Sequence, residues 1–164
     1  MMTPMSTTVT LADYHDAVHA QLVVDLLNAY ATDPMGGATP LPDDVRERLV
    51  PAMAATPGAF SVLCFVDDEP AGLVNCFMGF STFKAKPLVN IHDVVVVPGH
   101  RGKGLTRQML NEVERVARER GCCKLTLEVL TGNDVAQRAY ESFGFEGFEL
   151  DPEKGRAMFW EKPL

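Results

Sequence analysis

The residues best suited to bind an anion lie in residues 94–106, which read VVVVPGHRGKGLT. Gly102 and Gly104 lack a Cβ and adopt positive φ readily, so the backbone amides beside them can converge on an anion. The helix expected after this turn begins with N–H groups that have no intrahelical partner and with a partial positive charge. The side chains that add positive charge to the turn are Arg101, Lys103 and Arg107. The turn is therefore either a phosphate site at a helix start or an ordinary strand-to-helix loop.

Two well-known phosphate loops do not fit the spacing of this turn. A P-loop requires G-x-x-x-x-G-K-[ST], but Gly99 lies too close to Gly102–Lys103, and a glycine follows the lysine. A dinucleotide fingerprint requires a third glycine where Arg107 stands, although Glu128 lies near the distance expected for its acidic residue. Both alternatives are excluded by sequence.

A second group of polar residues follows in residues 133–145, which read NDVAQRAYESFGF. In a helix, Ala136 and Tyr140 lie four residues apart, and Asn133 lies three residues before Ala136. All three therefore share one stripe of the helix. A lone tyrosine on a helix is commonly a half-buried core residue, and this interpretation stays open for the segment by itself.

Length and charge limit the kinds of protein this chain can be. Its 164 residues fit a single domain, residues 1–164, because domains commonly contain about 100–200 residues. A hydrophobic content of 46% is enough for one sizeable core. The net charge of −7 argues against nucleic acid as a partner, since phosphate backbones bind broad basic surfaces. An acidic surface could instead attract a cationic substrate such as an amine.

The cysteines and the apolar segments indicate a cytoplasmic protein without a metal site. The four cysteines lack zinc-ligand spacing, so we expect no metal, and the adjacent pair is poorly placed for a structural disulfide. Neither a signal peptide nor an apolar run of about 18 residues is evident, so we expect no contact with a membrane.

The first half of the chain is expected to alternate between strands and helices. A strand is expected over residues 7–11, and Asp13 is expected to cap the next helix, with Asp16 as the acidic partner of a capping box. A Pro- and Gly-rich loop over residues 32–42 precedes a helix over residues 43–55 that Pro51 breaks or bends.

The second half contains the two polar segments described above. The expected elements are a hairpin of residues 60–66 and 72–80, a strand over 88–97, a helix over 105–120, a strand over 125–130, a helix over 133–142, and closing strands over 145–150 and 157–161. The order strand, glycine turn, helix, strand is a βαβ unit, whose two strands should be parallel. We therefore expect a mixed α/β domain.

With both polar segments in view, the chain resembles the GNAT superfamily of N-acetyltransferases. That superfamily pairs R/Q-x-x-G-x-G/A, at the pyrophosphate of acetyl-CoA, with N-x-x-A-x-x-x-Y-x-x-x-G-F further along, and both halves are present across residues 88–145. The resemblance implies the GNAT fold, an α/β (α+β) fold with a mostly antiparallel twisted sheet, a central parallel βαβ unit that binds acetyl-CoA, and flanking helices. The stretches IHDVVVVP, RGKGL and GCCKLTL look most like small-molecule amine acetyltransferases.

The resemblance also implies which residues bind acetyl-CoA. They are Val95, Val96, Val97, Arg101, Gly102, Lys103, Gly104, Leu105, Thr106, Arg107, Asn133 and Tyr140. Backbone groups near Val95 and Val97 are expected to contact the pantetheine arm and the thioester, where an amide would stabilise the oxyanion. Asn133 is expected to bond near the pantetheine, to cap the last helix, or to do both. Thr106 departs from the superfamily's Gly or Ala, and its β-branched side chain narrows the approach to phosphate.

Acetyl transfer to an amine requires an acid and a base. Tyr140 is the expected general acid, because a phenol of pKa about 10 stays protonated at neutral pH and can donate to a thiolate. Asp93, directly or through water, is favoured as the base over His92 and Glu128. Strand alternation places His92 and Asp93 on opposite faces. Substrate contacts are expected among Tyr30, Asp33, Met35, Gly36, Gly37, Asn75, Phe80, Ser81, Thr82, Phe83 and Asn90.

The resemblance therefore implies an enzyme that transfers an acetyl group from acetyl-CoA to the primary amine of a small molecule by direct attack. Two alternatives stay open. One is a non-catalytic CoA-binding module that acts in sensing or assembly, and the other is a protein or peptide N-acetyltransferase. Tyr140 favours the enzyme over the non-catalytic module. Homodimers are frequent in this superfamily, so a homodimer is a further expectation.

Overall fold

The structure, a computed structural model, describes residues 3–164, which divide into a first unit ending at Glu128 and a second unit from Val129 to Leu164. The first unit contains β1 (Thr7–Leu11), α1 (Ala17–Thr32), η1 (Pro34–Gly36), α2 (Asp43–Ala54), β2 (Phe60–Val66), β3 (Glu69–Ser81), β4 (Lys86–Val96), η2 (Pro98–His100), α3 (Leu105–Glu119) and β5 (Leu125–Leu127). The second unit contains α4 (Asp134–Phe143) and η3 (Pro152–Lys154). None of the helices within residues 3–164 has the length and apolar character needed to cross a membrane.

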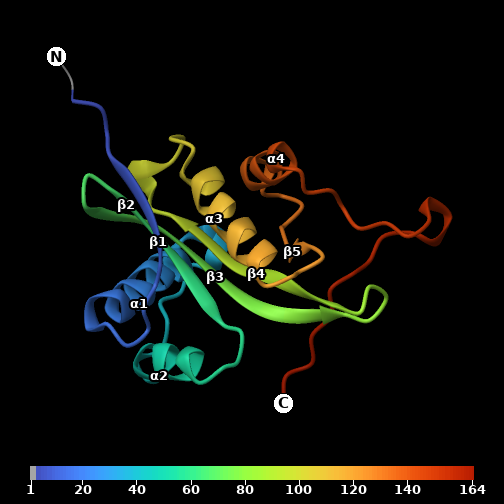
Figure 1. The fold of residues 1–164 in the computed structure, drawn as a ribbon, viewed down its shortest axis with the longest axis horizontal. Helices are drawn as coiled ribbons and strands as arrows, with labels where there is room; N and C mark the ends of the chain where they lie inside the picture. The colour runs from blue at the N-terminus through green and yellow to red at the C-terminus, as the bar shows by residue number, and fades with distance from the viewer. Residues whose placement is uncertain (1–2) are drawn as a thin grey trace. The chain divides into compact units, whose positions relative to one another are not determined.

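The first unit is built on one five-stranded sheet with the order β1-β2-β3-β4-β5 (Figure 1). Neighbouring strands are antiparallel except β4 and β5, which run parallel because α3 connects them as a crossover. The expected mixed, mostly antiparallel sheet with one parallel βαβ unit is confirmed, but among the described strands this unit lies at the edge of the sheet, because β5 is the last strand in the order. The tight β2–β3 turn places Asp67 and Asp68 at φ of +48° and +66°, the left-handed region that a two-residue hairpin requires.

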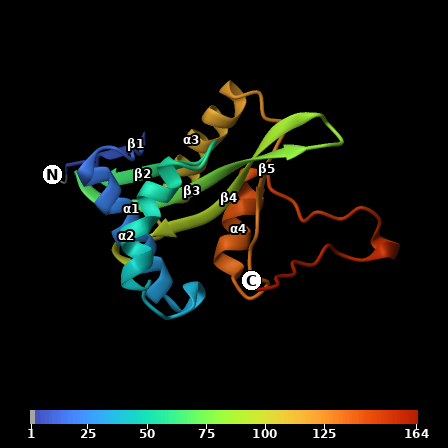
Figure 2. The same ribbon diagram turned by 90° about the horizontal axis from the view of Figure 1, so that it is seen from below.

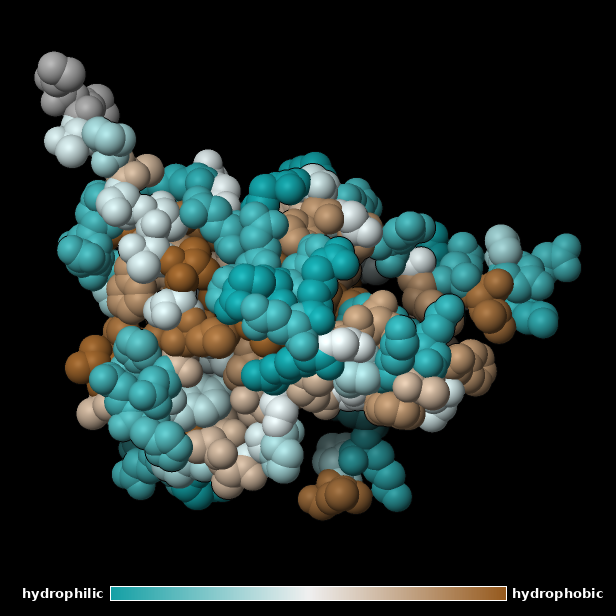
Figure 3. All heavy atoms as spheres, viewed as in Figure 1, coloured by the Kyte–Doolittle hydropathy of each residue, from teal (hydrophilic) through white to brown (hydrophobic). Residues whose placement is uncertain are grey.

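Helices cover both faces of this sheet. Figures 1 and 2 show α1 and α2 on one face and α3 on the other. The core beneath α1 and α2 contains Val23, Val24, Leu26, Val50, Met53, Leu63, Leu73 and Val95. On the opposite face α3 packs closely, because a Cβ added to Gly72 would lie 2.8 Å from Met109 Cε. Hydrophilic side chains cover the outer side of α3 (Figure 3).

Two expectations about helices need correction. Asp16, and not Asp13, is the N-cap of α1, since its side chain accepts the N–H groups of Val18 and His19. Asp13 instead closes a local turn, in which its carboxylate accepts the N–H of His15 at 2.9 Å. Of the two outcomes expected at Pro51, a break or a bend, the break is excluded, because α2 continues through that residue to Ala54.

The second unit has one well-defined helix and no strand among its described residues. Gly144 ends α4 at φ +115°, a value that a residue with a Cβ rarely adopts. After α4 the described residues contain only η3, so the expectation of closing strands over 145–150 and 157–161 is wrong. Alternation favours a strand only when one face becomes buried, and Phe148, Leu150 and Trp160 are all more than 70% exposed.

Candidate functional site

The glycine turn before α3 has the geometry expected of an anion site. Gly102 and Gly104 lie at φ of +75° and +74°, and a Cβ built on either would have no described atom within 4 Å. Gly104 is the N-cap of α3, and within the described residues no side chain caps this helix start. The first helical hydrogen bond runs from the Gln108 N–H to the Gly104 carbonyl. The amides before Gln108 are therefore placed to bind an anion.

Arg101 ties this turn to the far end of α1. Its Nε donates to the Val96 carbonyl at 3.0 Å, and its Nη2 forms an ion pair with Asp33 Oδ2 at 2.9 Å. The N–H of Met35 and then the Arg101 guanidinium hold the pKa of Asp33 below its usual range. Arg101 thus positions the turn relative to β4 and α1, in addition to placing positive charge there.

The other expected residues of the turn differ in exposure. Leu105 is buried and anchors the start of α3 against the sheet. Thr106 is half-buried in the first turn of that helix, whereas Lys103 and Arg107 are exposed. The two long basic side chains therefore lie at the surface, next to the uncapped end of α3.

β4, the strand before the turn, pairs with β5 over only part of its length. β4 pairs with β5 only from Val89 to Ile91, whereas its pairing with β3 continues to Val96. The Val97 N–H donates to the Ala71 carbonyl at 2.9 Å, which places it on the β3 side. Because successive backbone groups point to opposite sides, Val95 also faces β3, and Val96 faces the side that β5 has left. The open backbone edge is thus centred on Val96.

A β-bulge in the pairing of β3 with β4 lies at the point where β4 separates from β5. Asn75 of β3 pairs with Asp93, and the next residue, Cys76, pairs with Ile91. His92 is therefore an extra residue of β4, without a partner of its own in the β3 register.

The bulge changes which way the two candidate bases point. The His92 ring packs edge-on against Phe77 at 5.3 Å between centroids, and Phe77 packs on the core under α1 and α2. Asp93 lies on the same side, since its Oδ2 accepts a hydrogen bond from Asn75 Nδ2 at 3.1 Å. The expectation that His92 and Asp93 face opposite sides is wrong, because the extra residue interrupts the alternation. Both side chains lie on the α1 and α2 face.

Other polar groups surround Asp93. Burial, then the charges of Asp93 and Asp33, raises the pKa of the Tyr30 phenol. Tyr30 thus lies within electrostatic reach of both carboxylates. Glu128, the third candidate base, is exposed and directly follows β5.

Some of the positions expected to contact substrate lie near Asp93 and His92, and others do not. Asn90 belongs to it, since its Oδ1 lies 3.2 Å from His92 Nδ1 and its Nδ2 donates to Thr126 Oγ1. Phe83, by contrast, is 98% exposed in the β3–β4 turn. Sequence reasoning missed Tyr14 and Ser61, which bond to each other at 2.7 Å and reach Asp93 through Asn75. The strand register connects Ser61 with Asn75 and Asp93, and Tyr14 reaches Ser61 from the turn between β1 and α1, so no local pattern could have indicated them.

The second unit presents Asn133 and Tyr140 on α4. Asn133 is the N-cap, and its Oδ1 accepts the N–H of Ala136 at 3.2 Å. The Tyr140 ring packs edge-on against Phe145 at 6.0 Å, and the Tyr140 carbonyl accepts the N–H of both Gly144 and Phe145. The end of the helix therefore brings the Phe145 ring against the Tyr140 ring.

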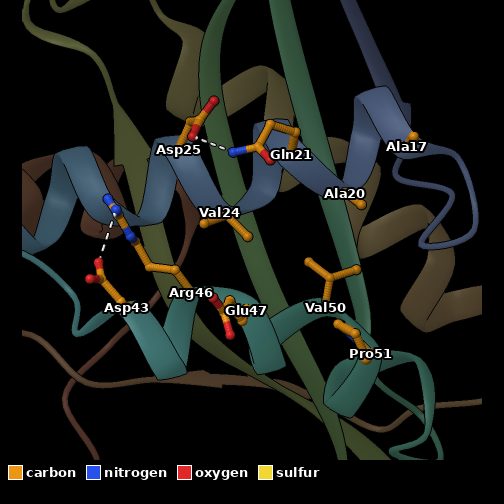
Figure 4. Close-up of a pocket in the computed structure, with 10 residues that line it drawn as sticks. All are labelled: Ala17, Ala20, Gln21, Val24, Asp25, Asp43, Arg46, Glu47, Val50 and Pro51. Atoms are coloured by element: carbon orange, nitrogen blue, oxygen red, sulfur yellow. Dashed lines mark hydrogen bonds and ion pairs between the residues drawn. The ribbon is translucent and has the colours of Figure 1, made fainter.

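A separate groove of about 820 Å³ lies between α1 and α2 (Figure 4). Its lining consists of Ala17, Ala20, Gln21, Val24, Asp25, Asp43, Arg46, Glu47, Val50 and Pro51. Polar pairs lie along it, with Gln21 bonded to Asp25 and Arg46 bonded to Asp43 (Figure 4). None of these ten residues is among those expected to bind the cofactor or act in catalysis.

Comparison with known proteins links this geometry to one family. The model of the acetyltransferase (GNAT) family matches residues 23–145. Streptothricin acetyltransferase of Streptomyces lavendulae is 44% identical over 63 residues, which are 38% of this chain and 33% of that protein. Thialysine N-epsilon-acetyltransferase of Bos taurus is 31% identical over 88 residues, 50% of this chain and 51% of that protein. The chain thus spans about a third to a half of the length of these relatives.

Solved structures share the whole fold at low sequence identity. An aminoglycoside N-acetyltransferase, AAC(6')-Iy in complex with CoA, superposes with a TM-score of 0.77 at 17% identity and covers 100% of this chain and 99% of its own. The same enzyme with a bisubstrate analogue, CoA-S-monomethyl-acetylneamine, gives a TM-score of 0.75 at 18% identity, covering 99% of this chain and 100% of its own. These likenesses show a common fold.

Proposed function

Because the chain belongs to the acetyltransferase (GNAT) family, we propose that it transfers an acetyl group from acetyl-CoA to the primary amine of a small molecule. The observation that carries this proposal is the open glycine turn at the uncapped start of α3, directly after the part of β4 that has left β5. Relatives named as streptothricin, thialysine and aminoglycoside acetyltransferases support a small amine as the acceptor class.

The turn and the open strand edge would hold the two ends of the acetyl-CoA arm. Gly102 and Gly104 leave room for a pyrophosphate to approach the amides at the start of α3, where the helix dipole favours negative charge. The backbone N–H of Val96, on the side that β5 has left, is our proposed donor to the thioester oxygen. The Val97 N–H is a poorer candidate because it donates to Ala71.

Asp93 is our proposed base and Tyr140 our proposed acid. Asp93 takes a proton from the acceptor ammonium, and the neutral amine then attacks the thioester carbon directly. As the new C–N bond forms and the C–S bond breaks, Tyr140 gives its phenolic proton to the CoA thiolate. The attacking nitrogen then loses its second proton to the Tyr140 phenolate, which leaves a neutral amide and restores the phenol. His92 lies on the same face as Asp93, so it is the alternative base that the bulge makes available.

The charges near Asp93 support a cationic acceptor. Asp33 and Asp93 are both close enough to Tyr30 to raise the pKa of its phenol, after burial as the largest cause. Ammonium groups are attracted to carboxylates. We propose that the acceptor approaches as an ammonium ion attracted by Asp93, since the ion pair with Arg101 offsets the charge of Asp33.

Thiol release from acetyl-CoA across a panel of small amines tests this function. We expect turnover with at least one di- or polyamine, and we expect Tyr140→Phe to lower kcat by about 10²- to 10⁴-fold while calorimetry shows unchanged acetyl-CoA binding. Binding of acetyl-CoA without turnover of any small amine or peptide would favour the non-catalytic module. Turnover of peptides alone would favour the protein acetyltransferase, and absence of acetyl-CoA binding would refute the cofactor assignment.

We also propose a homodimer. Phe148, Leu150 and Trp160 of the second unit expose large apolar surfaces of the kind that protein contacts commonly cover. Analytical ultracentrifugation at micromolar concentration should give twice the mass of the chain, and a monomer mass at all concentrations would contradict the proposal.

A further inference from the structure

A line of polar side chains crosses the apolar face of the sheet beneath α1 and ends at Asp93. Tyr14 Oη lies 2.7 Å from Ser61 Oγ, Ser61 Oγ donates to Asn75 Oδ1 at 2.6 Å, and Asn75 Nδ2 donates to Asp93 Oδ2 at 3.1 Å. The strand register creates this line, because Ser61 of β2 pairs with Asn75 of β3, and Asn75 pairs with Asp93 of β4.

The middle of the line is fully buried. Ser61 and Asn75 are 0% and 1% exposed, and they are the only buried polar residues among those that the structure describes. Their neighbours two positions along the strands, Leu63 and Leu73, belong to the hydrophobic core. Polar groups in such surroundings cost free energy unless they are hydrogen-bonded, and apolar residues at both positions would extend the core. Packing alone therefore does not explain the two residues.

The direction of each hydrogen bond in this line follows from the Asp93 carboxylate, the acceptor at its end. An ionised Asp93 can only accept, so Asn75 must present its NH₂ group to Asp93 and its Oδ1 to Ser61. Ser61 has one hydroxyl proton, which it donates to Asn75, so Tyr14 must donate to Ser61. Burial raises the pKa of the Tyr14 phenol, which keeps this donor protonated. All three hydrogen bonds thus point toward the Asp93 carboxylate.

We propose that Asn75 is a positioning residue for Asp93, and that Ser61 and Tyr14 lock its amide in the one orientation that donates to the carboxylate. The bond to Oδ2 fixes the rotation of the carboxylate, so Oδ1 takes the proton from the acceptor ammonium. This inference rests on the proposed function, in which Asp93 is the base. The bulge makes such positioning necessary, since the extra residue His92 removes the regular strand geometry that would otherwise orient Asp93.

Three titratable groups lie near Asp93, two of them within reach of its charge and the third next to it in the chain. They are Tyr30 of α1, Cys76 of β3 and His92 of β4. Burial first, and the charge of Asp93 second, raises the pKa of both Tyr30 and Cys76, so both stay neutral during turnover. The dependence of kcat/KM on pH is therefore also measured with His92→Gln, which removes the remaining titratable neighbour.

A double-mutant cycle with thiol release as the assay tests the proposal. We expect Asn75→Ala to lower kcat by about 10- to 100-fold, because misplacing a catalytic group by about 1 Å has an effect of this size. The KM for acetyl-CoA should not change, and the acid limb of the kcat/KM profile should move to higher pH as the carboxylate loses a donor. In an Asp93→Asn background, Asn75→Ala should lower kcat by less than about twofold. Asn111→Ala, at an exposed site on α3, is the matched control and should leave kcat unchanged.

The outcomes separate this inference from the function on which it rests. If the losses of Asn75→Ala and Asp93→Asn multiply in the double variant, or if the acid limb stays in place, Asn75 has only a structural role. If Asp93→Asn turns over like the wild type, the assignment of the base fails instead. Should Asn75→Ala not fold, the same cycle with Ser61→Ala decides, since that variant frees the amide to rotate and keeps the Asn75 side chain.

Discussion

Three glycines with the same backbone conformation allow the role of the turn in binding to be separated from its role in stability. Gly102 and Gly104 lie in the proposed phosphate turn at φ of +75° and +74°, and Gly121 lies past the other end of α3 at φ +72°. A Cβ at any of the three would have no described atom within 4 Å. Substitution by alanine therefore adds backbone strain of equal size at each site, without a steric clash.

The expected stability loss follows from this conformation. An L-residue in the left-handed region costs about 1–2 kcal/mol. For a chain of this length, each kcal/mol lowers Tm by about 2–4 °C, so each variant should melt about 2–8 °C below the wild type. The three variants should agree with one another within error, as their φ values and surroundings match.

CoA affinity should differ among the same variants. A methyl group at Gly102 or Gly104 keeps a phosphate from one or two amides, and a hydrogen bond to a charged group contributes about 1.5–3 kcal/mol. Calorimetry should then show CoA binding weakened by about 10- to 150-fold for Gly102→Ala and Gly104→Ala, and unchanged for Gly121→Ala. If Gly104→Ala lost stability but bound CoA like the wild type, or if Gly121→Ala weakened CoA equally, the turn would not be the phosphate site.

Three further predictions concern single side chains. Thr106→Ala should tighten CoA binding by up to about tenfold in calorimetry, as the β-branched side chain narrows the approach to the helix start; weaker binding would show that the hydroxyl bonds to phosphate. The Met35 N–H first, and Arg101 second, hold the pKa of Asp33 below 3.8. The interactions of the ionised carboxylate therefore stabilise the folded state above pH 3.8, and this stabilisation disappears as the pH falls through the lowered pKa. Carboxyl NMR titration should find Asp33 titrating nearer 3.8 in Arg101→Met, and an unchanged titration would contradict the ion pair. Burial raises the pKa of the Cys76 thiol, so mass spectrometry should find it unmodified by iodoacetamide at pH 8 until urea unfolds the protein.

Elements whose signals are local could be predicted, and elements that depend on a partner could not. The helix over residues 105–120 is found as α3 with bounds one residue apart, since its apolar stripe and Gly121 act within the segment. The closing strands over 145–150 and 157–161 are absent from the described residues, because alternation alone does not supply a neighbouring strand. The sequence places the N-cap of α1 one turn too early, at Asp13, because Asp13 and Asp16 are both good caps and only the backbone path distinguishes them.

Sequence by itself determined the parts of the candidate site that are built from neighbouring residues. The glycines of the turn, the basic side chains around it and the Asn133 cap of α4 follow from residue types at short spacing, because backbone conformation and helix caps are decided within a few residues. Tertiary structure alone decided where the candidate base points. The extra residue His92 turns two consecutive side chains to one face, and the register of three strands joins Ser61, Asn75 and Asp93. Tyr14 is added to them from the turn between β1 and α1. Pairing between distant strands depends on how the whole sheet packs, so no local pattern encodes it.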